Sequence, residues 1–317
     1  MAEIAREASR PLSIAVVGVD PEMRVRVIDR LFLPETGAAR GRQALPATPF
    51  VQMYPTMAPT DGYPETPNVF DFVIDVGGGR VDAAPGDTVI YSVAEIGGSI
   101  DDTLSRIYDD RPELSLPLAR NFPVFRTRAA QQVIQQTAMT NAEFSLITGV
   151  VAAFPLFGLI LPANALSDIL ILTKNQIMMT LRLAAVYGLE VDYRSRMREV
   201  GPILVNAFGW RAVARELVGA VPPAGFVFRA MISYAGTVAV GKAAQVYYEC
   251  GETVTRSQAQ RFYREAYAGS KDRIRALAAR MRIGRGGGQR ATALPPSEER
   301  ESSTNDSVQT EDESHLR

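Results

Sequence analysis

Hydrophobic and polar positions divide the chain into two parts that differ in periodicity. Before residue 112, short apolar runs alternate with polar or Gly- and Pro-rich connectors, which is typical of buried strands between loops. Beyond residue 112, apolar residues recur at helical spacing over long stretches. We therefore predict a reduced α/β domain of the GTPase or Rossmann type, followed by a mostly α-helical domain.

The first part is interpreted as strands with helices between them. Apolar runs that end at turn residues predict the strands, and amphipathic segments predict the helices. The strands are expected at Ser13–Gly18, Phe50–Tyr54, Val69–Val76 and Thr88–Ala94, and the helices at Pro21–Leu33 and Asp101–Asp110, the second capped by Ser99. This order of strand, loop and helix is that of a phosphate-binding unit.

A phosphate loop after the first strand is predicted only in degenerate form. A P-loop that starts at Gly18 needs Gly, Lys and Ser or Thr further on, to admit phosphate to the backbone and to bind magnesium. The chain has Met23, Arg24 and Val25 at those positions. Gly18 and Arg24 are the candidate cofactor-binding residues, and we predict no bound cofactor. The guanine-reading segment of GTPases, Asn-Lys-x-Asp, is replaced by residues 94–97, Ala-Glu-Ile-Gly.

The stretch Phe144–Ser167 carries no formal charge, and its length would suffice to cross a hydrocarbon core of about 30 Å. Pro155, Gly158 and Pro162 interrupt it, so each half is shorter than a span requires. We predict an apolar helical hairpin over residues 144–172. It either dips into a membrane or is buried by neighbouring helices, and a straight crossing is the least expected of the three.

A polar stripe begins within the second half of this hairpin. Asp168, Asn175 and Arg182 recur every seven residues and so share one face of the predicted helix. In a membrane such groups would pair with one another or line a cavity. In a helical bundle they form a solvated or interhelical face, which is the role that we expect.

A row of small residues marks a later helix. Ser233, Thr237 and Gly241 recur every four residues, and such rows let helix backbones approach closely. The uncharged part of this helix, Ala230–Gly241, spans only about 18 Å at 1.5 Å per residue. That length is too short to cross a bilayer, so we expect a buried core helix.

The charges are concentrated near the C-terminus, where their sign changes along the chain. A basic amphipathic helix is expected up to residue 283, and an acidic, disordered tail over residues 284–317. The basic helix is the candidate for direct membrane contact, because cations are attracted to anionic lipid. Its candidate residues are Arg261, Arg264, Lys271, Arg273 and Arg275. Two alternatives stay open: a solvated outer helix, and a charge masked by the acidic tail.

Composition excludes several classes of catalytic and metal site. The chain has one cysteine, Cys250, and one histidine, His315, which rules out an internal disulfide, a zinc site and a Ser–His or Cys–His triad. We therefore predict no catalytic and no metal-ligating residues. The basic surface lacks a reading motif, so nucleic acid is not an expected partner. Residues 1–10 are expected to be disordered. Because they lack the apolar core of a secretory signal, we expect the protein in the cytoplasm, at the inner face of the cell membrane.

Several motifs of the second part occur in an order that resembles a known family. They are FPVFR, a helix with TAMTNA, the FPLFG break, SDILILTKNQIMMTLRLAAVYG, AFGWR and GTVAVGKAAQVYY, and together they cover roughly Leu114–Gly269. This succession is similar to the YcjF-type helical domain, an uncharacterised family often fused behind GTPases of the Era-like class. The resemblance implies a helical domain at a membrane, with no established reaction and no functional residues to transfer.

These observations lead to one functional expectation and two alternatives. We expect a non-enzymatic, membrane-associated protein with a pseudo-GTPase domain over residues 11–112 and a YcjF-type domain over residues 113–283. The first alternative is a nucleotide-responsive switch in which Arg24 and the Gly77–Arg80 loop still hold a phosphate. The second is a soluble scaffold that binds a partner protein. The sequence indicates no small-molecule substrate.

Overall fold

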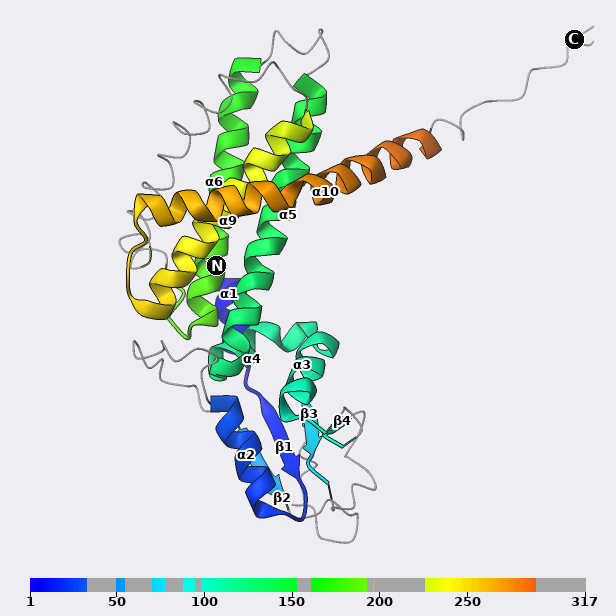
Figure 1. Cartoon of the computed structure of the whole chain (residues 1–317), viewed down its shortest axis with the longest axis vertical. Helices are drawn as coiled ribbons and strands as arrows, with labels where there is room; N and C mark the ends of the chain where they lie inside the picture. The colour runs from blue at the N-terminus through cyan, green and yellow to red at the C-terminus, as the bar shows by residue number, and fades with distance from the viewer. Residues whose placement is uncertain are drawn as a thin grey trace, which may run out of the picture. The chain divides into compact units, whose positions relative to one another are not determined.

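The structure is a computed structural model, and it describes residues 1–32, 50–54, 70–77, 88–94, 98–152, 161–192, 196 and 226–288. The chain divides into two units, Met1–Leu277 and Ala278–Arg317. Within the first unit an α/β part is followed by a helical part, as the sequence predicts (Figure 1).

The described residues of the α/β part form a four-stranded parallel sheet. Its strands are β1 (Ser13–Val17), β2 (Phe50–Tyr54), β3 (Phe72–Asp75) and β4 (Val89–Ser92), in the order β2-β1-β3-β4. Val17 lies beside both Tyr54 and Asp75, so the carboxyl ends of the first three strands are aligned. The central strand β1 is buried on both faces, which explains its continuous apolar run. The strand order reverses between β1 and β3, the place where doubly wound sheets bind their ligands.

Two helices follow β1 and β4 at the predicted positions. They are α2 (Pro21–Phe32) and α3 (Ile100–Asp110). Val27 and Leu31 of α2 lie four residues apart on one face and are both buried. The predicted cap of α3 is confirmed, because the Ser99 hydroxyl accepts from the Asp102 N–H at 3.4 Å.

The sequence predicts that residues 1–10 are disordered, and the structure shows that this prediction is wrong. The chain begins with helix α1 (Ala2–Ala8), which packs against α4 (Ser115–Asn121) and α6 (Leu161–Val186). Ile4 and Ala8 share one face of α1 and are 1% and 2% exposed. A short apolar stripe therefore orders a segment whose composition is mostly polar.

A run of short helices joins the two parts. It consists of the 3-10 helix η1 (Pro112–Leu114), α4, and the 3-10 helix η2 (Pro123–Phe125). Aromatic rings connect this run to the α/β part: the Phe122 ring meets Phe125 at 6.4 Å and Phe32 of α2 at 5.4 Å between centroids. Both contacts are edge to face, the favoured geometry for aromatic pairs.

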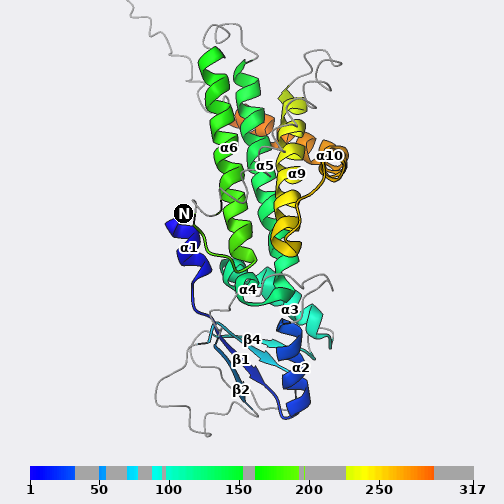
Figure 2. The same ribbon diagram turned by 90° about the vertical axis from the view of Figure 1, so that its left-hand side faces the viewer.

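Long helices stand side by side in the helical part (Figure 2). They are α5 (Arg126–Ala152), α6 and α9 (Phe226–Cys250). α5 and α6 flank the predicted break, Phe154–Gly158, which lies outside the described part of the chain. Gly188, with φ +77°, ends α6, and its N–H and that of Leu189 donate to the Ala185 and Ala184 carbonyls at 2.9 Å. The predicted glycine at this helix end is confirmed.

The row of small residues in α9 faces α5. Ser233 lies beside Asn141, and a Cβ added at Gly241 would come within 2.6 Å of Ile134 Cγ1. α9 therefore runs antiparallel to α5, with the backbones in close approach at the glycine. The prediction of a buried core helix is confirmed by the buried side chains of Ala235, Val238, Ala239 and Ala244. Within the part of the chain that the structure describes, none of the helices combines the length and the apolarity needed to cross a membrane.

Helix α10 (Arg256–Gly288) is the basic helix of the prediction. It begins with a reciprocal capping box, in which the Thr255 N–H donates to Gln258 Oε1 at 2.8 Å and the Gln258 N–H donates to Thr255 Oγ1 at 3.3 Å. The residues of α10 up to Leu277 lie across α9 and α5 (Figure 1). The start of the disordered tail at residue 284 is wrong, because α10 continues to Gly288; each glycine weakens a helix by only about 1 kcal/mol.

Candidate functional site

The carboxyl edge of the sheet, where the strand order reverses, is closed by the chain itself. The Gly18 N–H donates to the Tyr54 carbonyl at 3.1 Å, and the Val19 N–H donates to the Gly77 carbonyl at 3.3 Å. A Cβ at Gly18 would overlap the Val76 side chain and lie 3.0 Å from the Gly77 carbonyl oxygen. Both amides that follow β1 are therefore used within the sheet, whereas a phosphate cradle needs free amides.

Arg24 is turned back on the same loop. Its guanidinium donates to the Gly18 carbonyl and, at 3.3 Å, to the Val19 carbonyl. The Asp20 carboxylate accepts from the Glu22 N–H at 2.8 Å and so occupies the N-terminus of α2, where a phosphate would sit in a P-loop. The structure thus brings the predicted residues Gly18 and Arg24 together, but as hydrogen-bond partners of each other.

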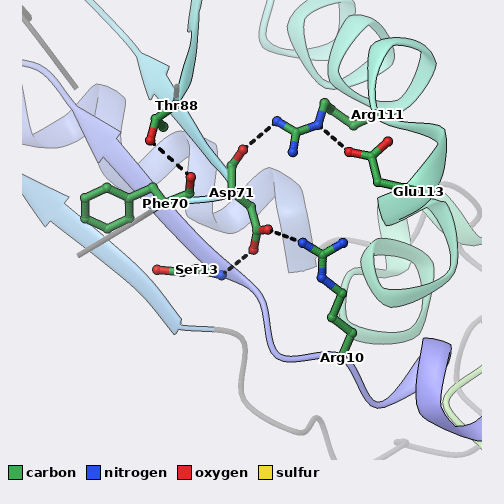
Figure 3. A network of polar contacts seen from close by, with 7 residues as sticks. All are labelled: Arg10, Ser13, Phe70, Asp71, Thr88, Arg111 and Glu113. Carbon is green, nitrogen blue, oxygen red and sulfur yellow. Dashed lines mark hydrogen bonds and ion pairs between the residues drawn. The ribbon is translucent and has the colours of Figure 1, made fainter. Parts of the chain in front are cut away.

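A second polar cluster lies at the opposite, amino edge of the sheet (Figure 3). The Asp71 carboxylate, 13% exposed, accepts from Arg10 at 2.8 Å and from the Ser13 N–H at 2.9 Å. Arg111 donates at 2.6 Å both to the Asp71 carbonyl and to the Glu113 carboxylate. The cluster ties the sheet to the segments that follow α1 and α3, with its charges paired among themselves. Sequence reasoning missed it, because an acid between two phenylalanines has the pattern of a strand's polar face.

A buried hydrogen-bond chain crosses the helical part. Asn141 of α5 is fully buried and donates through Nδ2 to Thr237 Oγ1 of α9 at 2.9 Å. Asn175 of α6 donates through Nδ2 to Asn141 Oδ1 at 2.7 Å. The Asn141 backbone carbonyl also accepts from the Ser233 hydroxyl at 3.1 Å. Because unpaired buried polar groups are costly, these hydrogen bonds favour a single register among α5, α6 and α9.

The predicted polar stripe of α6 does not keep one environment along its length. Asn175 is half-buried and has the interhelical role that we expect, whereas Arg182 is exposed. The Asp168 side chain lies outside the described side chains, and residues 78–80 of the second predicted phosphate loop lie outside the described chain. Spacing along one helix gives no signal for Asn141, the partner that another helix supplies.

The apolar side of α10 is covered by the helical part rather than left open. Tyr263, 3% exposed, packs on Ala235 and Ala239 of α9, and Ile274 is fully buried. Burial, with a smaller contribution from Tyr267, raises the pKa of Tyr263 to about 12. The apolar face of α10, which the sequence predicts as the face that could contact lipid, is therefore packed against the other helices.

The predicted membrane-contact cations of α10 are all exposed, but some of them have internal partners. Arg273 donates to Gln135 Oε1 of α5 at 3.0 Å and to the Tyr234 hydroxyl of α9 at 3.3 Å. Arg261 lies 3.7 Å from Glu265, one helical turn further on. The contacts of Arg273 hold α10 against α5 and α9, whereas the Arg261–Glu265 pair lies within α10 itself.

The remaining cations of the predicted set, Arg264, Lys271 and Arg275, form a second group, called here the cation row. Their spacings of seven and four residues place them on one side of α10. Among the described residues, none of the three is part of an ion pair. The cation row is thus available to an anionic partner outside the protein.

The hairpin end is the end of the helical part at which α5 ends and α6 begins (Figure 2). Large apolar side chains are exposed on both helices as they approach it: Ile147 is 41% exposed, Leu170 69% and Ile171 40%. Glu143 of α5 and Lys174 of α6 are exposed just before these residues. A charged level is therefore followed, toward the hairpin end, by an apolar one.

Comparisons of this chain with protein-family models, curated proteins and solved structures give no match. The resemblance to the YcjF-type domain therefore stays a prediction, and a function must be argued from the residues and geometry above. Among the residues that the structure describes, no group of three or more Cys, His, Asp and Glu side chains is placed to hold a metal ion.

Proposed function

We propose that the protein is a non-enzymatic, membrane-associated protein whose hairpin end enters one leaflet of the bilayer. The observation that carries the proposal is the exposure of Ile147, Leu170 and Ile171 on both helices of the hairpin. Ile147 lies within the uncharged stretch Phe144–Ser167, and Leu170 and Ile171 follow this stretch after Asp168. Contiguous exposed apolar surface bounded by charged residues is typical of a membrane or protein contact.

The dimensions of the hairpin favour a dip into one leaflet. From Glu143 to Ala152 the helix rises about 13 Å at 1.5 Å per residue, close to half of a hydrocarbon core of about 30 Å. Glu143 and Lys174 would then lie at the level of the headgroups, where charged side chains stay hydrated. Insertion to this depth needs no helix that crosses the membrane.

In this proposal the α/β part is a pseudo-GTPase domain that binds no nucleotide. Support comes from the Gly18 and Val19 amides, which are already hydrogen-bonded within the sheet, and from Arg24, which is bound to the carbonyls of the same loop. The proposed location is the cytoplasmic face of the cell membrane. The resemblance to the YcjF-type domain implies a membrane location, and the cytoplasmic side follows from the prediction made for residues 1–10.

Cell fractionation tests the proposal. Membranes that contain the full-length protein are washed with alkaline carbonate, which strips proteins held at the surface and leaves inserted ones in place. We expect the protein in the membrane fraction before and after the wash. Recovery wholly in the soluble fraction would contradict membrane association and favour the soluble scaffold instead. Release by the wash would limit the contact to the membrane surface.

A further inference from the structure

We propose that the cation row of α10 binds anionic lipid headgroups, so that the protein selects anionic over neutral bilayers. This inference rests on the proposed function, because the hairpin end must first bring α10 to the membrane. The observation that carries it is separate from the one behind the proposed function, and it is the orientation of α10 on the helical part. Contacts on the two sides of α10 fix that orientation.

One side of α10 faces the hairpin end. The Tyr267 ring meets the ring of Phe228 at 6.1 Å between centroids, and Phe228 lies near the start of α9. Because α9 runs antiparallel to α5, its start lies at the hairpin end. On the other side of α10, Glu265 lies 3.8 Å from Lys242, much further along α9. The side of α10 that carries Tyr267 is therefore the one turned toward the hairpin end.

The cation row belongs to this side. Arg264 lies three residues before Tyr267 and Lys271 four residues after it, so both are its neighbours on the helix surface. Arg275 follows Lys271 by four residues and extends the same row. Arg273, by contrast, is turned to Gln135 on the helices beneath α10.

The row lies close to the level at which the headgroups are proposed to lie. Arg229 follows Phe228 directly and is one helical turn closer to the hairpin end than Ser233, which donates to the Asn141 carbonyl. Glu143 lies two residues beyond Asn141 in the same direction, so Arg229 and Glu143 mark almost the same level. Side chains next to the Tyr267–Phe228 contact are therefore within about one Debye length, 8–10 Å, of the proposed membrane surface.

The geometry suits lipid binding by several cations at once. The residues of α10 up to Leu277 lie across the helices of the hairpin rather than along them (Figure 1), so the members of the row lie side by side instead of at increasing depth. Arginine and lysine donate to the phosphate and carboxylate oxygens of anionic headgroups. Each cation near such a surface strengthens binding about fivefold, which multiplies to roughly 100-fold for the row.

Vesicle sedimentation with the full-length protein tests the inference. Wild type is compared on neutral phosphatidylcholine vesicles and on vesicles that also contain phosphatidylserine. A variant that neutralises the row carries Arg264→Gln, Lys271→Gln and Arg275→Gln. The control removes three exposed arginines elsewhere in the chain, with Arg6→Gln, Arg26→Gln and Arg106→Gln. Thermal unfolding of both variants shows that the fold is kept.

We expect the row variant to lose roughly 100-fold in affinity for the anionic vesicles, to bind neutral vesicles as wild type does, and to lose the salt dependence of wild type. The control should keep nearly all of its affinity. Equal binding of wild type to both kinds of vesicle, or equal losses in variant and control, would overturn this inference and leave hairpin insertion standing. Wild type that binds neither kind of vesicle would overturn the proposed function, and this inference with it.

Discussion

The carboxyl edge of the sheet and the hairpin end of the helical part are built in opposite ways. At the carboxyl edge, backbone amides, Asp20 and Arg24 are engaged by groups of the same loop or sheet, although the strand order marks this edge as a ligand site. At the hairpin end, Ile147 and Leu170 are exposed beyond the level of Glu143 and Lys174. A ligand site needs unsatisfied groups, so strand order alone does not make one, whereas uncovered apolar surface calls for a partner.

The largest expected effect comes from charging the hairpin end. The double substitution Ile147→Glu and Leu170→Glu should reduce vesicle binding by more than about 100-fold, because burial of each apolar side chain contributes about 1.5–3 kcal/mol. Stability should change little, since both side chains are well exposed. The measurement is flotation of the protein with anionic vesicles.

The matched control places the same charges at the other region. Val19 and Val25 are also exposed apolar residues, 55% and 48%, on the loop after β1 and on α2. Val19→Glu with Val25→Glu should leave vesicle binding as in wild type. If the control loses as much binding as the hairpin variant, membrane contact is not specific to the hairpin end and the contrast between the two regions fails.

A smaller effect is expected where α9 packs against α5, one of the two helices of the hairpin. Gly241→Ala places a Cβ 2.6 Å from Ile134 Cγ1, and overpacking of this kind lowers the free energy of unfolding by about 1–3 kcal/mol. Gly236→Ala, in the same helix, meets no atom within 4 Å and should raise that free energy by up to about 1 kcal/mol. Urea unfolding monitored by circular dichroism measures both. Equal effects of the two substitutions would contradict the close approach.

Much of the fold could be predicted from the sequence. The apolar runs of the strands, the Ser99 cap, Gly188 and the small-residue row each reflect a local or near-local rule, and each is found where expected. Helix α1 could not be predicted so simply, because Ile4 and Ala8 are ordered by α4 and α6, which lie far along the chain. Its stability depends on tertiary packing rather than on helix propensity.

The candidate sites were less predictable, because each depends on which elements meet. Spacing places Asn175 on a face of its helix, but only the fold brings Asn141 to it at 2.7 Å. The sequence does not distinguish the cations of α10 from one another, yet Arg273 is bonded to Gln135 of α5 while Lys271 belongs to the row toward the hairpin end. Sequence periodicity gives a residue's angle around its own helix, but it does not show which residues of other elements pack against that face.

Alkaline pH should loosen the contact between α10 and α9. Burial raises the pKa of Tyr263 to about 12 from an ordinary 10.0. Because the folded-state pKa is the higher one, this contribution to stability is fully present below pH 10 and is lost as the pH rises toward 12. We expect wild type to lose about 1–2 kcal/mol more than Tyr263→Phe over this interval, in urea unfolding at each pH. Parallel pH profiles of the two proteins would show that Tyr263 ionises without opposing the fold.

The smallest expected effect is that of nucleotide on the carboxyl edge of the sheet. A ligand at about 100 times its dissociation constant stabilises a protein by about 2.7 kcal/mol, which a thermal shift with magnesium and GTP or ATP would detect. We expect no shift in wild type, because the Gly18 and Val19 amides are hydrogen-bonded within the sheet and Asp20 occupies the N-terminus of α2. Arg24→Ala should cost a little stability, through the lost bonds to the Gly18 and Val19 carbonyls, and should be equally unresponsive. A saturable shift in wild type that Arg24→Ala abolishes would mean that Arg24 leaves these carbonyls to bind phosphate. The carboxyl edge of the sheet would then be a ligand site, and the contrast with the hairpin end would fail.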